Sequence, residues 1–384
     1  MGQFDSNRDV LSFFSGGMGL DLGLTQAGLS VVMGQDFDKA CVATMRQNGC
    51  AVMPGDIRLI QPEDILSATG LQVGEPFLIC GGPPCQPFST AGKRLGINDP
   101  RGSLFMDFIR MIDFIRPRFF VMENVKGLIS AKLKSSDGRQ GLVLDVILDE
   151  FRKLGYGFVY GLLDAVNYGT PQFRERFVLM GTRDGEDIFL PMPMYFQVHQ
   201  CAQYRWRTVG DAILDLEQDC GPCAAFSKQR AAYLHFVPEG GNWRDLPPDK
   251  IQAAMGGAYQ SGGGKVGFYR RLSYHQPSPT VTTSPAQKAT MLCHPKQDRP
   301  LSVKECARLQ EFPDDWIFVG TMAEQYRQIG NAVPVGLGRA IGQVFLSVAD
   351  GTAVIETKRL RGTDVHEKLK RAMALGQCER SVKE

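Results

Sequence analysis

The chain has 384 residues and a formal net charge of +2, so its overall charge does not indicate a nucleic-acid partner, and any such binding must rest on a local basic surface. Hydrophobic residues make up 43% of it and charged residues 22%, which is ordinary for a soluble globular protein. Its ten cysteines show no short-range disulfide pattern, and no apolar run approaches the length of a membrane span. Together with a polar N-terminus that lacks a signal-peptide core, these features predict a cytoplasmic protein.

The N-terminal part predicts a strand, a glycine-rich turn, a helix and a second strand. Such a unit is typical of nucleoside binding, because glycines let the backbone approach the ligand and an acid at the end of the second strand can accept both ribose hydroxyls. Dehydrogenases share the unit, but the turn reads Gly-Gly-Met-Gly and not Gly-x-Gly-x-x-Gly, which argues against a dinucleotide. The elements are a strand over 10–14, the turn 15–19, a helix over 20–27 closed by Gly28, and a strand over 31–36 ending at Asp36.

Two residues after this unit have the chemistry to contact a nucleoside base. Phe37 follows the acid and could stack on an adenine, or it could be a core aromatic residue. Asp56 ends a short strand over 52–56 and could take the adenine amino group, although an Asp after a Gly is often only a turn or cap residue. Helices are expected on either side of this strand, over 38–48 and 62–68.

The most informative stretch is GGPPCQPFS at residues 81–89, which follows a buried strand over 77–80. Its glycines and prolines forbid a helix or a strand, so it predicts a rigid loop at the carboxyl end of a strand, where ligands bind in open α/β sheets. Packing alone gives little reason for prolines on both sides of Cys85, so we predict a nucleophile and not a small buried hydrophobe. The site must then lower the pKa of this thiol or couple its proton loss to attack. A long basic loop over 90–102 and a helix over 103–115 follow.

Charged residues at the ends of two later strands are expected to face the same crevice. Glu123 follows a buried strand over 118–122, and in an apolar pocket its pKa would rise, so that a protonated acid could donate to a ring nitrogen. It could instead be an acid at a helix N-terminus. Arg174 and Arg176 alternate along an expected strand over 172–181, where two guanidinium groups suit an anion or a base carbonyl, although a solvated strand face is the commoner place for arginine.

The composition changes after Gly181. Residues 184–270 are rich in proline and glycine, and basic and aromatic residues interleave at 204–207 and 265–271, which suits phosphate contacts and base-edge reading. A zinc site is permitted by the cysteines and histidines of this region, but their irregular spacing argues against a metal. These residues are His199, Cys201, Cys220, Cys223 and His235.

The remaining chain is expected to fold into a strand, two helices and a tail. The strand covers residues 279–283, and a helix starting near Ser302 covers 301–309. An apolar helix through Val348 follows residues 328–335, and residues 351–384 form a polar, frayed helical tail.

Five stretches, in their order and spacing, resemble the DNA (cytosine-5)-methyltransferases of the bacterial modification type. The resemblance covers residues 8–348, and the Pro-Cys-Gln loop together with Glu-Asn-Val is highly specific. One departure is visible, because Met18 stands in the turn where the family usually has glycine. The stretches are FSGGMG at 14–19, GGPPCQPFS at 81–89, ENV at 123–125, QFRER at 172–176 and QIGNAVP at 328–334.

The resemblance implies transfer of a methyl group from S-adenosylmethionine to C5 of a cytosine that has been flipped out of double-stranded DNA. Cys85 would attack C6 of the ring, and Glu123 would hold N3 and the exocyclic amine. Arg176 would hold O2, with Arg174 beside it, and the basic loop after Cys85 would close over the base. The implied cofactor-binding residues are Phe14, Ser15, Gly16, Gly17, Gly19, Asp36, Phe37, Asp56, Ile57, Pro83, Asn331 and Val333.

The implied architecture is α/β, with a doubly wound, Rossmann-like S-adenosylmethionine-dependent methyltransferase sheet and a smaller, irregular target-recognition domain. Residues 1–183 would form the catalytic and cofactor-binding domain, and residues 184–300 the target-recognition domain. Residues 301–350 would return to complete the catalytic domain, and residues 351–384 would form the polar tail.

The implied partner is double-stranded DNA, bound by a monomer that touches no membrane. A cognate restriction endonuclease would be a genetic partner only. The nearest alternative is a tRNA cytosine-5 methyltransferase of the same family, against which the longer recognition segment argues. A catalytically dead DNA-binding partner is disfavoured because Cys85, Glu123 and Arg176 are all present.

Overall fold

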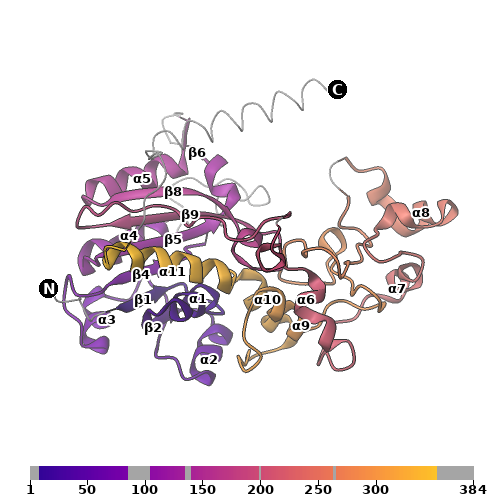
Figure 1. Cartoon of the computed structure of the whole chain (residues 1–384), viewed down its shortest axis with the longest axis horizontal. Helices are drawn as coiled ribbons and strands as arrows, with labels where there is room; N and C mark the ends of the chain where they lie inside the picture. The colour runs from indigo at the N-terminus through magenta and orange to yellow at the C-terminus, as the bar shows by residue number, and fades with distance from the viewer. Residues whose placement is uncertain (1–7, 85–103, 135–139, 199, 263–264, 353–384) are drawn as a thin grey trace.

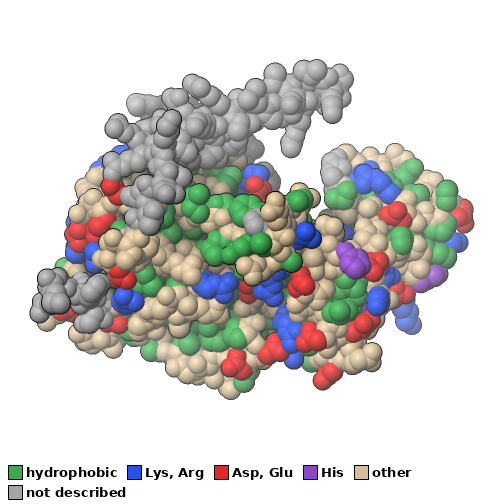
Figure 2. All heavy atoms as spheres, in the orientation of Figure 1, with side chains coloured by type: hydrophobic (Ala, Val, Ile, Leu, Met, Phe, Trp, Pro, Cys, Tyr) green, Lys and Arg blue, Asp and Glu red, His purple; other side chains and the backbone are tan. Residues whose placement is uncertain are grey.

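The computed structural model describes residues 8–84, 104–134, 140–198, 200–262 and 265–352 (Figure 1). The expectations for Cys85, for the basic loop over 90–102, for His199 and for most of the tail lie outside the described residues. The described chain forms a sheet covered by helices, with a less regular lobe beside it, at the right in Figures 1 and 2.

A seven-stranded sheet has the order β3-β2-β1-β4-β5-β9-β8. The first five strands of that order pair in parallel, whereas β9 runs antiparallel to both of its neighbours. The order reverses between β1 and β4, and such a switch point leaves a crevice at the carboxyl ends of the strands. The expected doubly wound α/β fold is therefore confirmed. The strands are β1 (Asp9–Phe13), β2 (Ser30–Asp36), β3 (Val52–Pro54), β4 (Leu78–Gly81), β5 (Phe119–Val125), β8 (Gly157–Asp164) and β9 (Glu175–Thr182).

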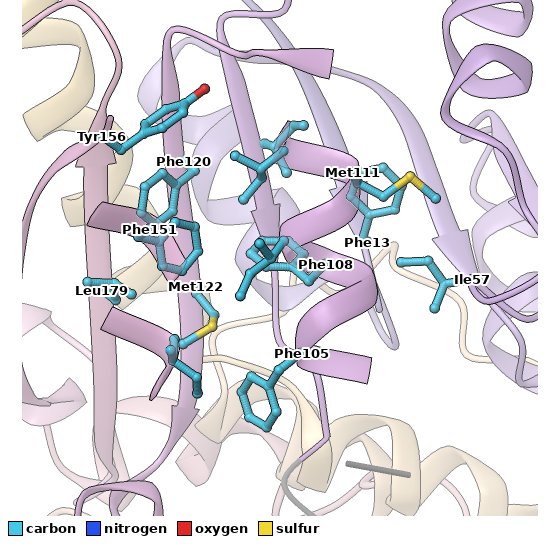
Figure 3. Close-up of a cluster of buried hydrophobic side chains, with 14 of the residues drawn as sticks. Phe13, Ile57, Phe105, Phe108, Met111, Phe120, Met122, Phe151, Tyr156 and Leu179 are labelled. Carbon is cyan, nitrogen blue, oxygen red and sulfur yellow. The ribbon is translucent and has the colours of Figure 1, made fainter. Parts of the chain in front are cut away.

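Successive side chains of each strand point to opposite faces of the sheet, and apolar side chains stand on both faces. Helices therefore cover the sheet on both sides. On one face α1 (Gly19–Ala27) and α11 (Val335–Ala349) pack together over Val10. On the other face α4 (Leu104–Ile115) and α5 (Val143–Lys153) pack over Phe13 and Phe120 (Figure 3). Phe120 stacks on Phe151 with 4.1 Å between the ring centroids. This two-sided core holds the strand ends, and so the crevice, in fixed positions.

Local capping residues set the ends of the N-terminal helices. The side chain of Asp38 accepts hydrogen bonds from the first backbone N–H groups of α2 (Lys39–Gln47). Gly28 ends α1 and Gly70 ends α3 (Pro62–Thr69), both in the left-handed conformation that glycine adopts without strain. These boundaries lie within a residue or two of those expected from the sequence.

The less regular lobe is built around its own apolar clusters. One cluster includes Leu234, Met255 and Tyr269, and a second joins Val209 and Leu301 to the helices that follow. Among the described residues 184–300, none adds a strand to the large sheet. The helices of this lobe and of the return segment are α6 (Val209–Ile213), α7 (Lys228–Leu234), α8 (Pro248–Met255), α9 (Val303–Leu309) and α10 (Met322–Asn331).

The structure corrects three expectations about local structure. The strand expected over 279–283 is wrong: the segment is irregular, and Val281 N donates to Gln172 Oε1 at 2.8 Å. No helix was expected between the one over 301–309 and the residues 328–335, yet α10 lies there and begins at a capping box of Thr321 and Glu324. The hairpin of β6 (Lys132–Lys134) and β7 (Gln140–Leu142) was also missed.

One described helical stretch, Met322–Ala349, is long and apolar enough to cross a membrane. It consists of α10 and α11, and 67% of its most apolar window is buried inside the protein. Packing of α11 against α1 and the sheet accounts for its apolar character.

Candidate active site

A cleft of about 780 Å³ opens at the switch point between β1 and β4. Its walls are the glycine turn after β1, the ends of β2 and β5, the loop after β4, the start of β9 and the link between α10 and α11. Segments that are far apart in the sequence therefore meet in one place. The expected site residues that line the cleft are Phe14, Ser15, Gly16, Gly19, Asp36, Phe37, Pro83, Glu123, Arg174, Arg176, Asn331 and Val333.

The glycine turn is held in an unusual backbone conformation. Phe14, Gly16 and Met18 all have positive φ angles, of 55°, 54° and 65°. Met18 thus occupies the left-handed region at a cost of about 1 to 2 kcal/mol, which its buried side chain offsets by packing on Val42 and Met45. The departure from glycine at this position leaves the turn intact.

Asp36 is buried behind the turn and is tied to it. Its Oδ2 atom accepts a hydrogen bond from Gly16 N at 2.8 Å, and its Oδ1 atom accepts one from Asp38 N at 2.8 Å. Burial raises the pKa of this carboxyl group, and these backbone N–H groups partly offset the effect. The backbone N–H groups of Gly16, Phe37 and Asp38 leave the carboxylate with acceptor capacity for a ligand hydroxyl.

Phe37 lies at the edge of the cleft with 69% of its side chain exposed. The alternative that it is a core aromatic residue is therefore wrong. An exposed aromatic ring beside a buried acid is free to stack on a planar ligand.

The return segment packs directly on the glycine turn. A Cβ atom added at Gly19 would lie 2.0 Å from the carbonyl oxygen of Val333, and one added at Gly17 would lie 3.2 Å from that of Gln328. Glycine is required at position 19 because no side chain fits there. Gly17 does not line the cleft, whereas Asn331 is exposed at its edge.

Asp56 and Ile57 do not line the cleft. The carboxylate of Asp56 binds Arg58, with Nε to Oδ1 at 2.9 Å, and this pairing lowers the pKa of Asp56. Ile57 is 2% exposed and belongs to the core under α4. The sequence places both residues after β3 but does not reveal these local partners.

Glu123 and Arg176 form a charged pair in the wall of the cleft. Antiparallel pairing of β5 with β9 sets Glu123 opposite Val178 and Val125 opposite Arg176, so the two side chains share one face. Arg176 Nε lies 2.7 Å from Glu123 Oε1, and both side chains are nearly buried. Burial raises the pKa of Glu123, and the neighbouring guanidinium groups of Arg176 and Arg174 partly offset the effect.

Arg174 differs from the expectation that it alternates with Arg176 on one face of a strand and offers its guanidinium group to a ligand. It precedes β9, is 1% exposed, and donates to three backbone carbonyl oxygens. Nη1 reaches Val281 O at 2.8 Å, while Nη2 reaches Gly330 O at 2.7 Å and Ala332 O at 3.0 Å. Arg174 thus ties the sheet to the irregular lobe and to the return segment, and its terminal nitrogens are already used.

The first residues of the loop that carries Cys85 are anchored to β5. Asn124 Nδ2 donates to Pro83 O at 2.7 Å, and its Oδ1 accepts from Val125 N. A Cβ atom at Gly82 would lie 3.1 Å from Glu123 Oε2, so this glycine lets the loop pass close to the acid. Cys85 itself lies outside the described residues.

Comparison with known proteins decides the family. Residues 9–347 match the family model described as C-5 cytosine-specific DNA methylase. The chain belongs to this family. Type II methyltransferase M.PspPI from Psychrobacter sp. (strain TA137) is 39% identical over 349 residues, which cover 88% of this chain and 78% of that protein. M.Sau96I from Staphylococcus aureus is 39% identical over 346 residues, covering 88% of this chain and 76% of that protein.

The fold agrees with solved structures of methyltransferases. A prophage-encoded DNA modification methyltransferase of E. coli aligns with a TM-score of 0.62 at 23% identity, covering 89% of this chain and 99% of that chain. At this identity the likeness concerns the fold alone. Together with the family match, it makes this protein a DNA (cytosine-5-)-methyltransferase with a Rossmann-like sheet.

The interleaved basic and aromatic stretches of this methyltransferase are partly structural. Arg271 is 4% exposed and donates to backbone oxygens of Val237 and Leu234 at 2.8 Å each. Trp206 donates to Asn167 Oδ1 at 3.0 Å and packs edge-on against Phe173. The polar groups of Arg271 and Trp206 are therefore bonded within the protein, whereas the sequence suggested that these stretches contact phosphates and base edges.

No three His, Cys, Asp or Glu side chains of the described part of the methyltransferase come together as metal ligands. Cys220 donates to Gly221 O at 3.4 Å, and the pKa of the partly buried Cys223 is raised.

Sequence reasoning missed two buried polar residues that line the cleft, Asp21 and Gln328. Each has one side-chain oxygen without a hydrogen-bond partner in the described part of the chain. The signal for Asp21 was a single acid between leucines in the first turn of an otherwise apolar helix.

Proposed function

We propose that this methyltransferase transfers the methyl group of S-adenosylmethionine to C5 of a cytosine within a specific double-stranded DNA sequence, as the modification part of a restriction-modification system. The observation that carries the proposal is the pairing of Glu123 with Arg176 in the same cleft as Asp36 and the glycine turn. A carboxyl and a guanidinium group side by side suit the polar edge of a cytosine, and the turn suits an adenosine. The Type II names of the relatives support the restriction-modification context.

The described residues fit this cofactor. Asp36 would hold the ribose hydroxyls, and Phe14 and Phe37 would flank the adenine. Asn331 and Val333, which lie against the turn, would adjoin the methionyl end. When bound, S-adenosylmethionine supplies an electrophilic methyl group on a sulfonium sulfur. Asp56, paired with Arg58 outside the cleft, has no role in this proposal.

The target ring must be activated, because C5 of cytosine is a poor nucleophile. In the proposed mechanism the Cys85 thiolate attacks C6 of a flipped-out base, and the new S–C6 bond makes C5 enamine-like. After C5 has gained the methyl group, a base removes its proton and the S–C6 bond breaks, which restores the thiolate. Arg176 would hold the ring O2 throughout.

Glu123 would stabilise the charge that appears on the ring. A buried carboxyl group with a raised pKa is more easily protonated, so it can donate to N3 while its other oxygen accepts from the exocyclic amine. The bond from Arg176 orients the group, and the chain passes close to it at Gly82, three residues before Cys85.

A transfer assay tests the proposal. Purified protein with methyl-labelled cofactor should place label at cytosine C5 of mixed-sequence duplex DNA. Cys85→Ser should abolish transfer and keep cofactor binding, whereas Cys201→Ser, which changes an exposed cysteine of the lobe, should transfer normally. Label absent from C5, or a Cys85→Ser variant with most of its activity, would contradict the proposal.

We also propose that residues 184–300 read the DNA, and that the protein is a cytoplasmic monomer. Competition between duplex DNA and tRNA distinguishes the proposal from the tRNA alternative. If tRNA suppresses the transfer of label and duplex DNA does not, the tRNA alternative is favoured.

A further inference from the structure

Asp21 is a buried acid in the cleft that the proposed chemistry leaves without a role. It occupies the first turn of α1, is 2% exposed, and lines the cleft. Its Oδ1 atom has no hydrogen-bond partner among the described residues. An unpaired buried carboxyl oxygen is costly, so its retention needs a compensating partner.

Among the described residues, no group that acts on the Asp21 carboxyl carries a positive charge. The Ser12 hydroxyl on β1 lies beside the carboxyl group and lowers its pKa, whereas the negative charge of Asp36 on β2 raises it. Cys80 on β4 and Cys50 before β3 are the other titratable neighbours, and burial raises the pKa of both thiols. The environment of Asp21 is therefore negative, and a positively charged ligand would satisfy it.

The position of Asp21 indicates which part of a ligand it meets. Gly16, early in the turn, donates a hydrogen bond to Asp36, the acid that would hold the ribose hydroxyls. Gly19, two residues before Asp21, touches the backbone of Val333 in the return segment. Asp21 thus follows the end of the turn that packs on the return segment, and in the proposed function the methionyl part of the cofactor would adjoin that segment.

We propose that the Asp21 carboxylate binds the α-ammonium group of the methionyl moiety of S-adenosylmethionine. This inference rests on the cofactor of the proposed function. The ammonium group is a cation with three N–H donors and pairs with an acid that has an open acceptor. Gln328 offers a second open acceptor, because its Oε1 atom is also buried and unpartnered while Nε2 donates to Val319 O.

Binding titrations with three ligands test the assignment: S-adenosylhomocysteine, its deaminated analogue, and 5′-methylthioadenosine, which lacks the amino acid part. Asp21→Asn should weaken S-adenosylhomocysteine about 10- to 100-fold, as expected for a lost charge-assisted bond, and leave the other two within about twofold. Asp64→Asn is the matched control, since Asp64 holds the same position in α3 but is exposed and outside the cleft. It should change none of the three affinities.

The outcomes separate this inference from the proposed function. If the wild type binds none of the ligands, the cofactor assignment fails. If it binds S-adenosylhomocysteine and Asp21→Asn binds it equally well, or loses all three ligands alike, the role of Asp21 is overturned.

A measurement on the wild type keeps the test valid should the variant fail to fold. At pH 6, binding of S-adenosylhomocysteine should release protons from both Asp21 and Asp36. Binding of 5′-methylthioadenosine, which lacks the ammonium group, should release protons from Asp36 alone and therefore fewer. Calorimetry in two buffers of different ionisation enthalpy gives both numbers. Equal release by the two ligands would overturn the assignment.

Discussion

Replacing Asp21 by Asn should make the protein more stable at alkaline pH in the absence of ligands. Asn has the same shape as a protonated Asp, so the change removes only the ionised form. Burial raises the pKa of Asp21 from 3.8 to about 6. The folded state therefore favours the protonated acid, and its contribution to stability is present below pH 3.8 and is lost as the pH rises through 6.

The size of the gain follows from this difference in pKa. The pKa of Asp21 is about two units higher in the folded than in the unfolded state, which corresponds to about 3 kcal/mol at pH 8, where the group is ionised in both states. At pH 5 the folded state keeps most of the protons, and the gain should fall to about 1.5 kcal/mol.

Urea denaturation at pH 8 and pH 5, followed by tryptophan fluorescence, measures both values. The Asp64→Asn variant controls for the general effect of removing one acid from a first helical turn. A variant that is less stable than the wild type at pH 8, or that gains equally at both pH values, would refute the reasoning. A confirmed gain would mean that the acid is kept at a cost in stability for the sake of a ligand.

Three further substitutions probe the site. Met18→Gly relieves a left-handed backbone worth about 1 to 2 kcal/mol but removes a buried side chain worth about 2 to 3 kcal/mol, so urea denaturation should show a net loss of up to about 2 kcal/mol; a gain would contradict this balance. Arg174→Met leaves the carbonyl oxygens of Val281 and Gly330 without a side-chain donor, and Ala332 O with only Gln310 Nε2 at 3.3 Å, so it should cost about 2 kcal/mol or more by the same measurement; a wild-type midpoint would disprove its structural role. Glu123→Gln should fold and bind cofactor normally but transfer methyl groups at least about 100-fold more slowly, and a wild-type rate would remove Glu123 from the mechanism.

The sequence predicted elements whose signals are local. Asp38 caps α2 and Gly28 ends α1, and each acts within a few residues of its own position. The glycine turn and the acid at the end of β2 were equally readable, because a strand, a turn and a helix of this kind leave few other arrangements.

The errors concern contacts that depend on distant parts of the chain. Arg174 was expected beside Arg176 on one face of a strand, but its carbonyl partners, Val281 and Gly330, lie 107 and 156 residues away in the sequence. The segment around Val281 was expected to be a strand, yet a strand needs a neighbour to pair with, and the side chain of Gln172 takes that place. The burial of Arg271 was hidden for the same reason.

Chemical trapping tests the central claim most directly. Duplex DNA of mixed sequence in which 5-fluorocytosine replaces cytosine should react once, because fluorine at C5 cannot leave as a proton and the enzyme cannot release the ring. The account predicts a stable protein–DNA complex that forms only with S-adenosylmethionine present, and a single modified peptide that contains Cys85. Attachment of the DNA to another residue, or no complex despite normal methylation of ordinary DNA, would contradict it.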